Sequence, residues 1–369
     1  MPRPKGLFIL GAQDFGLIYG ADAQAEIGRL VDVYASPQTP ELVKHNPGVL
    51  RDAEVIFSGW GMCRVDQAFL DAAPNLKAIF YGAGGSGHVA TPEVVARGVV
   101  VTSAVEANSI PVAEYTLSTI IFSLKHGWRL MREVRQQRRF VERNDAPGCY
   151  RRTVGLISLG TVGRLVADRL RRLDLDVLAY DPFVSEKQAV ELGVELVSLE
   201  ELFGRSDVAS LHTPAMPSTV GMIHGQHLAS MRPGATFINT ARGTVVRQDE
   251  LVEVATRRSD LQFVLDVADT PERWAAGLPE WPDESSPLYT LPNVVLTPHI
   301  AGSVGQECSR MSRWMIEELK RYLAGEPLEW QITPRVEKAA IIQPTVAVTI
   351  PAAMSPAQSA SRTRARAVI

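Results

Sequence analysis

The sequence contains Val154-Gly-Leu-Ile-Ser-Leu-Gly-Thr-Val-Gly163, in which an apolar run typical of a buried strand passes through a glycine turn into a helix pattern. Gly160 would let the backbone approach a pyrophosphate, and Gly163 would let the helix pack closely on the strand. The amides of Thr161 and Val162 would lie at the N-terminus of that helix, where the partial positive charge attracts phosphate. The segment therefore predicts a dinucleotide-binding strand–turn–helix unit.

The next strand of this unit ends at Asp181, 18 residues after Gly163. A carboxylate there accepts hydrogen bonds from an adenosine ribose and repels a 2′-phosphate, so NAD is predicted rather than NADP. The pattern departs from G-x-G-x-x-G at Ser158, which occupies the place of the first glycine. By itself this segment also fits an ordinary glycine turn, and the strand, the helix and Asp181 around it favour the nucleotide site.

Short apolar runs alternate with helix patterns in two series, separated by the polar segment 143–148. In the first series we expect strands at Leu7–Leu10, Val31–Tyr34, Val55–Ser58, Ile79–Tyr81 and Val99–Thr102. In the second series we expect strands at Val154–Ile157, Asp176–Tyr180, Val194–Val197, Val208–Leu211, Thr236–Ile238, Phe263–Leu265 and Val294–Leu296. This alternation is typical of parallel βαβ units, so the sequence predicts an α/β fold with two lobes.

Two long helices are expected outside this alternation. One begins near Asn108–Ser109 and continues through Leu124, and the other carries an apolar face from Val304 to Tyr322. A shorter helix is predicted at Pro92–Ala96, with Thr91 as its N-cap. Residues 336–369 are rich in Ala, Pro, Ser and Thr without a period, and we expect them to be a disordered tail.

The composition excludes several classes of partner. The chain has 369 residues, 46% of them hydrophobic, and a net charge of −3, so no global basic field favours nucleic acid or anionic membranes. The arginine run at 129–143 is better explained as a solvated or subunit-facing helix. No apolar run reaches the length of a membrane span, and neither the three cysteines nor the histidines have metal-ligand spacing. A cytoplasmic protein without a metal site is predicted.

Three residues with chemical potential follow predicted strands. Arg242 follows the strand near Ile238, Asp266 ends the strand at Leu265, and His299 follows the strand at Leu296. Each has an alternative interpretation, as a surface charge, a turn cap or a core histidine. Ligands in open α/β sheets bind at the carboxyl ends of strands, and the joint placement of these three residues favours a functional site.

Taken together, these blocks resemble the D-isomer-specific 2-hydroxyacid dehydrogenases, the family of phosphoglycerate, glycerate, formate and D-lactate dehydrogenases. The resemblance is collinear over about residues 50–335. It comprises Tyr81-Gly-Ala-Gly-Gly85, Val112-Ala-Glu114, Thr153-Val-Gly155 through Gly163, Ala179-Tyr-Asp-Pro182, Leu211-His-Thr-Pro214, Asn239-Thr-Ala-Arg-Gly243, Leu265-Asp-Val267 and Thr297-Pro-His-Ile-Ala-Gly302.

This resemblance implies two Rossmann-like lobes with parallel sheets. A nucleotide lobe, 109–302, would be inserted into a discontinuous substrate-binding lobe, 1–108 plus 303–335, with the two long helices as the hinge crossings. It also implies a homodimer formed through the nucleotide domain. The expected reaction interconverts a 2-oxoacid and a D-2-hydroxyacid by hydride transfer, with NAD as the cofactor.

The resemblance also implies a role for individual residues. Arg242 would hold the substrate carboxylate and carbonyl, and His299 would act as the acid and base. The loop from Ala83 through Gly84 and Gly85 to Ser86 would bind the carboxylate through backbone amides. Residues expected at the cofactor are Ser158, Gly160, Thr161, Val162, Gly163, Asp181, Thr213, Thr240, Ala241, Asp266 and Ala301.

Some positions depart from the family pattern. The carboxylate partner of His299 is predicted to be Glu272, with Asp269 as an alternative, because Pro271 occupies the usual position. The segment 273–286 is longer than usual and would cover the active-site mouth or form a surface loop. Two other hypotheses remain open at this point, a non-enzymatic NAD(H)-responsive binding protein and a dehydrogenase for another small acid such as formate or phosphonate.

Overall fold

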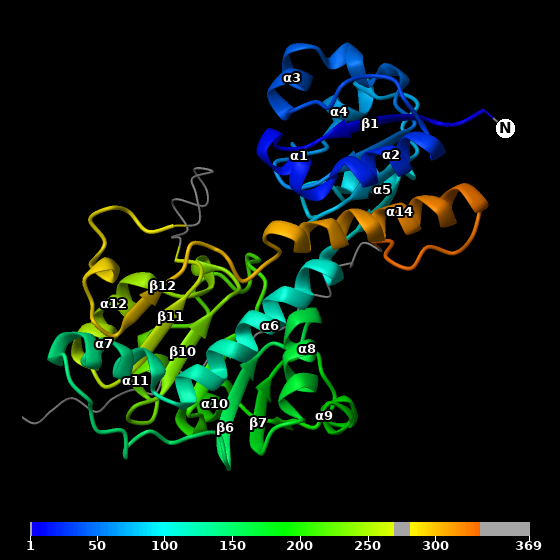
Figure 1. Ribbon diagram of the computed structural model, residues 1–369. Helices are drawn as coiled ribbons and strands as arrows, with labels where there is room; N and C mark the ends of the chain where they lie inside the picture. Colours follow the sequence, from blue (N-terminus) through cyan, green and yellow to red (C-terminus); the bar gives the residue numbers. More distant parts are fainter. Residues whose placement is uncertain (1, 269–280, 333–369) are drawn as a thin grey trace, which may run out of the picture. The chain divides into compact units, whose positions relative to one another are not determined.

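The computed structural model describes residues 2–268 and 281–332. Within them the strands form two parallel sheets, one of five strands and one of seven, as the α/β prediction required (Figure 1). Glu272, Asp269 and the predicted tail 336–369 lie outside the described residues, as does most of the segment 273–286. No helix in the described ranges is both long and apolar enough to cross a membrane.

The first sheet contains the five strands predicted for the first series, in the order β2-β1-β3-β4-β5. The strands are Lys5–Ile9 (β1), Asp32–Val33 (β2), Val55–Ser58 (β3), Ala78–Tyr81 (β4) and Val100–Ser103 (β5). The predicted bounds of β3 are confirmed, and β1 begins two residues earlier than expected. The prediction of a four-residue β2 was wrong, because this edge strand pairs with β1 at only two positions.

Helices cover both faces of the first sheet. One face carries Ala12–Ile18 (α1), Ala21–Leu30 (α2) and Cys308–Ala324 (α14), which pack over the aromatic side chains of β1, β3 and β4. The other face carries Pro40–His45 (α3), the 3-10 helix Pro47–Asp52, Gln67–Ala72 (α4) and Pro92–Ala96 (α5). Thr91 caps α5 by accepting a hydrogen bond from the amide of Val94, so the predicted start of this helix is confirmed.

The second sheet has the order β12-β11-β10-β9-β6-β7-β8. Its strands are Arg152–Ile157 (β6), Leu175–Tyr180 (β7), Glu195–Leu196 (β8), Val208–Leu211 (β9), Thr236–Asn239 (β10), Gln262–Leu265 (β11) and Val294–Leu296 (β12). Every strand predicted in the second series is therefore present. The expected four-residue strand at β8 was too long, because β8 pairs with β7 at two positions only.

Helices also cover both faces of the second sheet. Val105–Leu124 (α6), Thr161–Leu170 (α8) and Glu186–Leu192 (α9) pack on one face. Leu199–Arg205 (α10), Gly225–Ala229 (α11) and Gln248–Arg257 (α12) pack on the other. The remaining helices are Gly127–Gln137 (α7) and the 3-10 helices Gly243–Val245, Pro287–Tyr289 and Gly305–Glu307.

Helix α6 belongs to two hydrophobic cores. It begins three residues earlier than predicted, and its residue Ala107 packs in the core of the first sheet. Ala113 and Ile120 pack in the core of the second sheet. Pro111 lies between these two contacts and has no amide hydrogen to donate to the preceding turn, which weakens the helix there.

The chain returns to the first sheet after β12, as expected for a discontinuous lobe. Met311, Met315 and Leu319 of α14 are buried against that sheet, and Figure 1 shows α14 beside α1 and α2. The buried carboxylate of Glu318 accepts hydrogen bonds from the amides of the chain just past the helix and from Arg321. The inclusion of Val304 in the apolar face was wrong, because Val304 is exposed and precedes the helix.

Candidate active site

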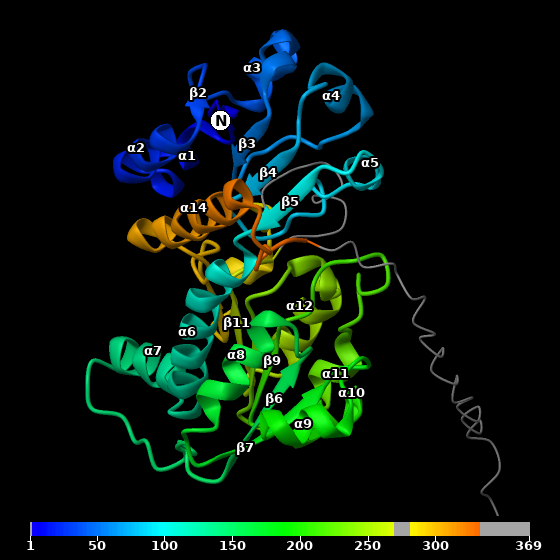
Figure 2. The same cartoon turned by 90° about the vertical axis from the view of Figure 1, so that its right-hand side faces the viewer.

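The second sheet reverses its strand order between β6 and β9, which lie side by side (Figure 2). The chain proceeds from β6 to β7 and β8 on one side, and from β9 to β12 on the other. Loops leaving adjacent strands at such a reversal run in opposite directions and leave a crevice at the carboxyl edge, where open α/β sheets bind ligands. Ser158 follows β6 and Thr213 follows β9, so both flank this point.

Ser158 makes the tight turn without glycine. Its φ of 77° is in the left-handed region, which costs a residue with a side chain more than it costs glycine. The hydroxyl Oγ of Ser158 lies 2.7 Å from Oγ1 of Thr213, so the side chain forms a hydrogen bond across the strand reversal. The departure from the glycine pattern is therefore accommodated by a contact between the two strands that border the crevice.

The two remaining glycines of the turn have the contacts that a dinucleotide site requires. A methyl group at Gly163 would overlap the carbonyl oxygen of Ser158, so glycine allows α8 to approach β6 closely. A methyl group at Gly160 would meet no described atom within 4 Å, which leaves the N-terminus of α8 open. Thr161 and Val162 form the first helical turn there, where backbone amides attract phosphate. The turn therefore fits a pyrophosphate.

Asp181 follows β7 at the same edge of the sheet. One carboxylate oxygen accepts from the amide of Leu159, at 2.7 Å, and the other accepts from the amide of Phe183, at 2.9 Å. These two bonds fix the carboxylate beside the turn, and each oxygen retains a lone pair for a ligand. The position suits a ribose hydroxyl.

A second turn at the carboxyl edge carries Arg242. The side chain of Asn239, the last residue of β10, accepts from the amide of Ala241 and donates to the carbonyl of Arg242. Thr240 lies with its hydroxyl 3.3 Å from that of Thr116 in α6. The guanidinium of Arg242 donates to the carbonyl of Ala241 at 2.7 Å, so the side chain folds back along its own turn.

His299 lies in a loop that is organised by Asp266. The fully buried carboxylate of Asp266 accepts from the hydroxyl of Thr297 and from the amides of Ile300 and Ala301, at 2.6–2.9 Å. The amide of His299 donates to the carbonyl of Asp266, and its φ of 52° is left-handed. Asp266 was expected to contact the nicotinamide, and the structure shows it holding the loop that carries the exposed imidazole of His299.

The glycine-containing loop after β4 forms the candidate carboxylate site of the first sheet. Ala83 is buried, its carbonyl accepts from the hydroxyl of Ser103, and Tyr81 donates to the carbonyl of Gly84. Gly85 has a φ of 77°, which glycine adopts readily. Across residues 2–268 and 281–332, no acceptor is present for the backbone amides of residues 83–86, so these amides can bind an anion.

Two residues at the carboxyl edge of the second sheet were not given a role from the sequence. His212 follows β9, and both of its ring nitrogens are inaccessible and without a hydrogen-bond partner in the described part of the chain. Burial lowers the pKa of His212 to about 4, so this imidazole is neutral at neutral pH. Tyr115 of α6 contacts Thr297. The sequence around Tyr115 has only a helix pattern, which does not predict that contact. His212 directly follows a predicted strand, and this position could have marked it as a residue of the site.

Residues 117–301 match the family model described as "D-isomer specific 2-hydroxyacid dehydrogenase, NAD binding domain". The chain belongs to this family. Within the D-isomer specific 2-hydroxyacid dehydrogenases, the matched region contains β6 to β12 and thus the whole carboxyl edge described above. The matched model describes an NAD-binding domain, in agreement with the open glycine turn and with Asp181.

Relatives from several organisms share this sequence pattern. The chain is 33% identical over 262 residues to the D-3-phosphoglycerate dehydrogenase of Mycobacterium bovis, covering 71% of this chain and 48% of that protein. It therefore spans about half the length of such relatives. It is 31% identical over 266 residues to the glyoxylate reductase of Korarchaeum cryptofilum, covering 71% of this chain and 77% of that protein.

A solved structure of the family has the same fold. The D-lactate dehydrogenase from Aquifex aeolicus, solved in complex with NAD and lactic acid, aligns with a TM-score of 0.66 and 26% sequence identity. The alignment covers 87% of this chain and 96% of that one. The two-lobed, parallel-sheet architecture predicted from the sequence is thereby confirmed.

Proposed function

We propose that the chain is an NAD-dependent oxidoreductase that interconverts a 2-oxoacid and a D-2-hydroxyacid. The observation that carries the proposal is the common edge of the second sheet. The nucleotide turn at Ser158–Gly163, the Arg242 turn and the Asp266-supported His299 loop all follow carboxyl ends of its strands. Family membership supports the same chemistry.

Each group of residues has a separate role in this reaction. When bound, NADH supplies the hydride that reduces the carbonyl carbon. Arg242 holds the substrate carboxylate and carbonyl and stabilises the negative charge that develops on the oxygen. His299 delivers a proton to that oxygen and removes it in the reverse direction. The amides of residues 83–86 hold the substrate carboxylate, and Glu272, or Asp269, orients the imidazole of His299.

We also assign a preference for NAD over NADP to Asp181. A 2′-phosphate beside this carboxylate would be repelled, and the carboxylate is held in place by two backbone amides. Thr213, Thr240 and Asp266 would contact the nicotinamide half, and Ala241 and Ala301 would also lie at the cofactor. The nucleotide domain would comprise 109–302, and the substrate domain 1–108 plus 303–335.

The test is NADH oxidation with glyoxylate, hydroxypyruvate, pyruvate and bulkier 2-oxoacids. At least one acid is expected to be reduced, and His299→Ala should lower kcat by about 100-fold or more while NADH still binds. His45→Ala is the matched control, because His45 is exposed and bonds only to its own helix among described residues. NADH binding without turnover of any acid would contradict the proposal and favour a non-enzymatic NAD(H)-responsive protein.

The carboxylate partner of His299 is tested separately. Glu272→Gln is expected to shift the acid limb of the pH dependence of kcat, whereas Asp269→Asn should leave it unchanged. If only Asp269→Asn shifts that limb, Asp269 is the partner.

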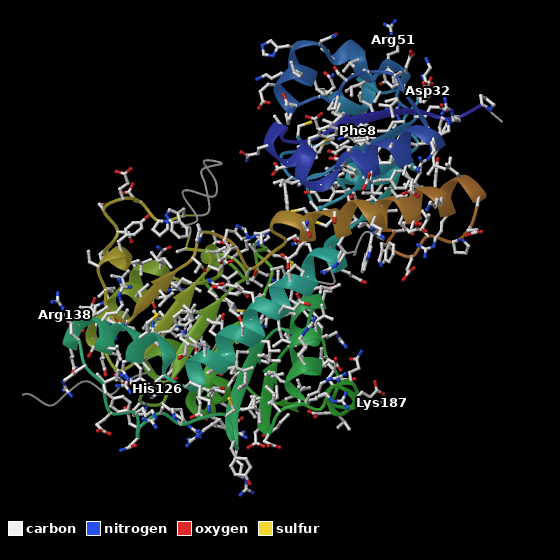
Figure 3. All side chains as sticks on the ribbon, viewed as in Figure 1. Phe8, Asp32, Arg51, His126, Arg138 and Lys187 are labelled. Atoms are coloured by element: carbon white, nitrogen blue, oxygen red, sulfur yellow. The ribbon has the colours of Figure 1, made fainter. Side chains whose placement is uncertain are left out.

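We further propose that two copies of the chain associate through the nucleotide domain, in the cytoplasm. No residue of α7 is buried, and Met131, Val134 and Phe140 expose 50%, 45% and 69% of their surface. Met131 and Val134 are three residues apart, so they share one face of α7. Exposed apolar side chains that lie together mark protein interfaces. A hollow of about 380 Å³ lies beside this helix, and Figure 3 shows Arg138 projecting from its end. The three cysteines are free, which fits a reducing compartment.

The oligomeric state is measured by light scattering coupled to size-exclusion chromatography. The wild type is expected to elute as a dimer, and Met131→Glu should shift it toward the monomer. Val190→Glu, on an exposed position of α9, is the control that should leave the dimer intact. A monomeric wild type at micromolar concentration would contradict the assignment.

A further inference from the structure

The loop that carries His299 is attached to α6 at both of its ends. At one end, the hydroxyl of Tyr115 lies 2.8 Å from Oγ1 of Thr297. At the other end, the amide of Ser303 donates to the side-chain oxygen of Asn108 at 3.0 Å. Asn108 and Tyr115 are seven residues apart, which is about two helical turns, so they lie on one face of α6. The helix therefore holds the whole loop from one side.

The direction of the hydrogen bonds at Tyr115 follows from the chemistry of the groups. Thr297 has one hydroxyl hydrogen, and it donates that hydrogen to the carboxylate of Asp266 at 2.6 Å. Tyr115 must consequently donate to Thr297. Burial raises the pKa of the Tyr115 hydroxyl, which keeps it protonated for this purpose. The result is a directed chain of hydrogen bonds from α6 through Thr297 to Asp266.

The same carboxylate fixes the backbone around His299. Its oxygen Oδ1 accepts from both Thr297 and the amide of Ile300, and its oxygen Oδ2 accepts from the amide of Ala301. Since His299 is in the left-handed region, its backbone needs such bonds on both sides to keep that conformation. Loss of the hydrogen bond from Tyr115 would leave Thr297 free to turn away from Asp266.

We propose that Tyr115 is a positioning residue for His299, acting through Thr297 and Asp266, and that α6 thereby sets the orientation of the proton-transferring imidazole. The proposal rests on the proposed function, because it assigns Tyr115 to the same reaction. The same helix also contacts the first sheet, since Ala107 near its start packs in the core of that sheet. A displacement of α6 would reach the loop of His299 through the side chains of Tyr115, Thr297 and Asp266.

The first test is kinetic. Tyr115→Phe is expected to lower kcat about 3- to 10-fold, because the lost bond supports the loop that carries the acid. It should change the KM for NADH by a smaller factor, because most of the proposed cofactor contacts lie outside this loop. Tyr150→Phe is the matched control, since Tyr150 is 70% exposed. An unchanged kcat in Tyr115→Phe would overturn the proposal.

The second test asks whether the effect passes through Thr297. In a Thr297→Ser background, which keeps the hydroxyl, Tyr115→Phe should lower kcat as much as in the wild type. In a Thr297→Val background it should have almost no further effect, because the connection is already broken. A full additional loss in the Thr297→Val background would show that Tyr115 acts by another route and would overturn the proposal.

The third test does not depend on turnover. Hydrogen exchange of the amides of Ile300 and Ala301 is expected to be about 3- to 10-fold faster in Tyr115→Phe than in Tyr150→Phe. If the wild type reduces no acid, the proposed function fails, and this measurement still decides whether Tyr115 anchors the loop. Equal exchange in both variants would remove the anchoring role.

Discussion

The two sheets of this chain share one topological feature and use it differently. In the first sheet the strand order reverses between β1 and β3, and in the second it reverses between β6 and β9. Both reversals create a crevice at a carboxyl edge. In the first, the amide of Gly11 donates to the carbonyl of Trp60 at 2.8 Å, and Gly61 lies against the backbone of Gly11. The chain fills that crevice with its own loops.

The corresponding point of the second sheet stays open. Its loops are joined by side chains, Ser158 to Thr213, and a methyl group added at Gly160 would have no described atom within 4 Å. The same strand order therefore gives a nucleotide site at the reversal of one sheet and a reversal closed by backbone contacts in the other. The difference depends on whether backbone or side chains bridge the reversal.

The largest expected loss of stability and of NADH affinity comes from a substitution in the nucleotide turn. Gly163→Ala places a methyl group on the carbonyl oxygen of Ser158, so α8 must move away from β6. We expect the free energy of unfolding to fall by about 2–3 kcal/mol and the Kd for NADH to rise by roughly tenfold or more. Denaturant titration and NADH fluorescence measure the two quantities.

Gly160→Ala is the matched variant, because its methyl group meets open space. It should change the free energy of unfolding by less than about 0.5 kcal/mol and still weaken NADH binding. Equal losses of stability in the two alanine variants would show that the close approach of α8 to β6 is not what Gly163 provides.

The closed edge is tested at Gly61, whose φ is 76° and whose added methyl would lie 2.8 Å from the backbone of Gly11. Gly61→Ala is expected to lower the free energy of unfolding by about 1–3 kcal/mol and to leave the Kd for NADH within about twofold. Gly16→Ala in α1, where the methyl would meet open space, is the control. If Gly61→Ala weakened NADH binding as strongly as Gly163→Ala, the two edges would not differ in function.

A pH-dependent effect is expected from His212 at the open reversal. Its folded-state pKa of about 4 lies below the ordinary value of 6.5, so the unfolded chain takes up the proton first as the pH falls. Stability should therefore decrease between about pH 6.5 and pH 4, and His212 should account for up to about 2 kcal/mol of the loss at pH 5. Thermal unfolding of His212→Asn at pH 7 and pH 5 measures this contribution. A pH dependence identical to that of the wild type would contradict it.

The smallest expected effect concerns Ser158. Ser158→Gly removes the left-handed strain and also the bond to Thr213, so the free energy of unfolding should change by less than about 1 kcal/mol. Ser158→Ala keeps the strain and loses the bond, and we expect it to be about 1 kcal/mol less stable than Ser158→Gly. The reverse order would show that the left-handed backbone at this position carries no strain for glycine to relieve.

Much of the fold followed from local patterns. Strands that are buried on both faces read as short apolar runs, so all twelve in the described ranges were located from the sequence, and Thr91 and Pro92 marked the start of α5. The lengths of β2 and β8 were overestimated. Each pairs with its neighbouring strand at only two positions, and strand pairing depends on the tertiary structure rather than on the local sequence. Arg242 and His299 were selected because strand ends of one sheet share an edge.

The contacts that hold the site residues in place could not be predicted from the sequence. Tyr115 and Thr297 are 182 residues apart, and nothing near Tyr115 in the sequence indicates the contact. The left-handed backbone of His299 is held by hydrogen bonds that its loop donates to Asp266, and local sequence propensity does not predict such distant contacts. The resemblance to a family suggested which residues act, and the geometry showed which residues hold them.

The late return of α14 to the first sheet has a consequence for how the chain is made. Buried side chains of α14, among them Met311, Met315 and Leu319, complete a core whose other buried side chains come from the first 107 residues, and about 200 residues separate the two groups. At about 5–20 residues per second, a ribosome needs roughly 10–40 s to add them. During that time the apolar face around Phe8, Phe57 and Phe80 lacks its covering helix, whereas the second sheet and its helices are contiguous in the chain. The lobe that leaves the ribosome first is thus the last to finish folding.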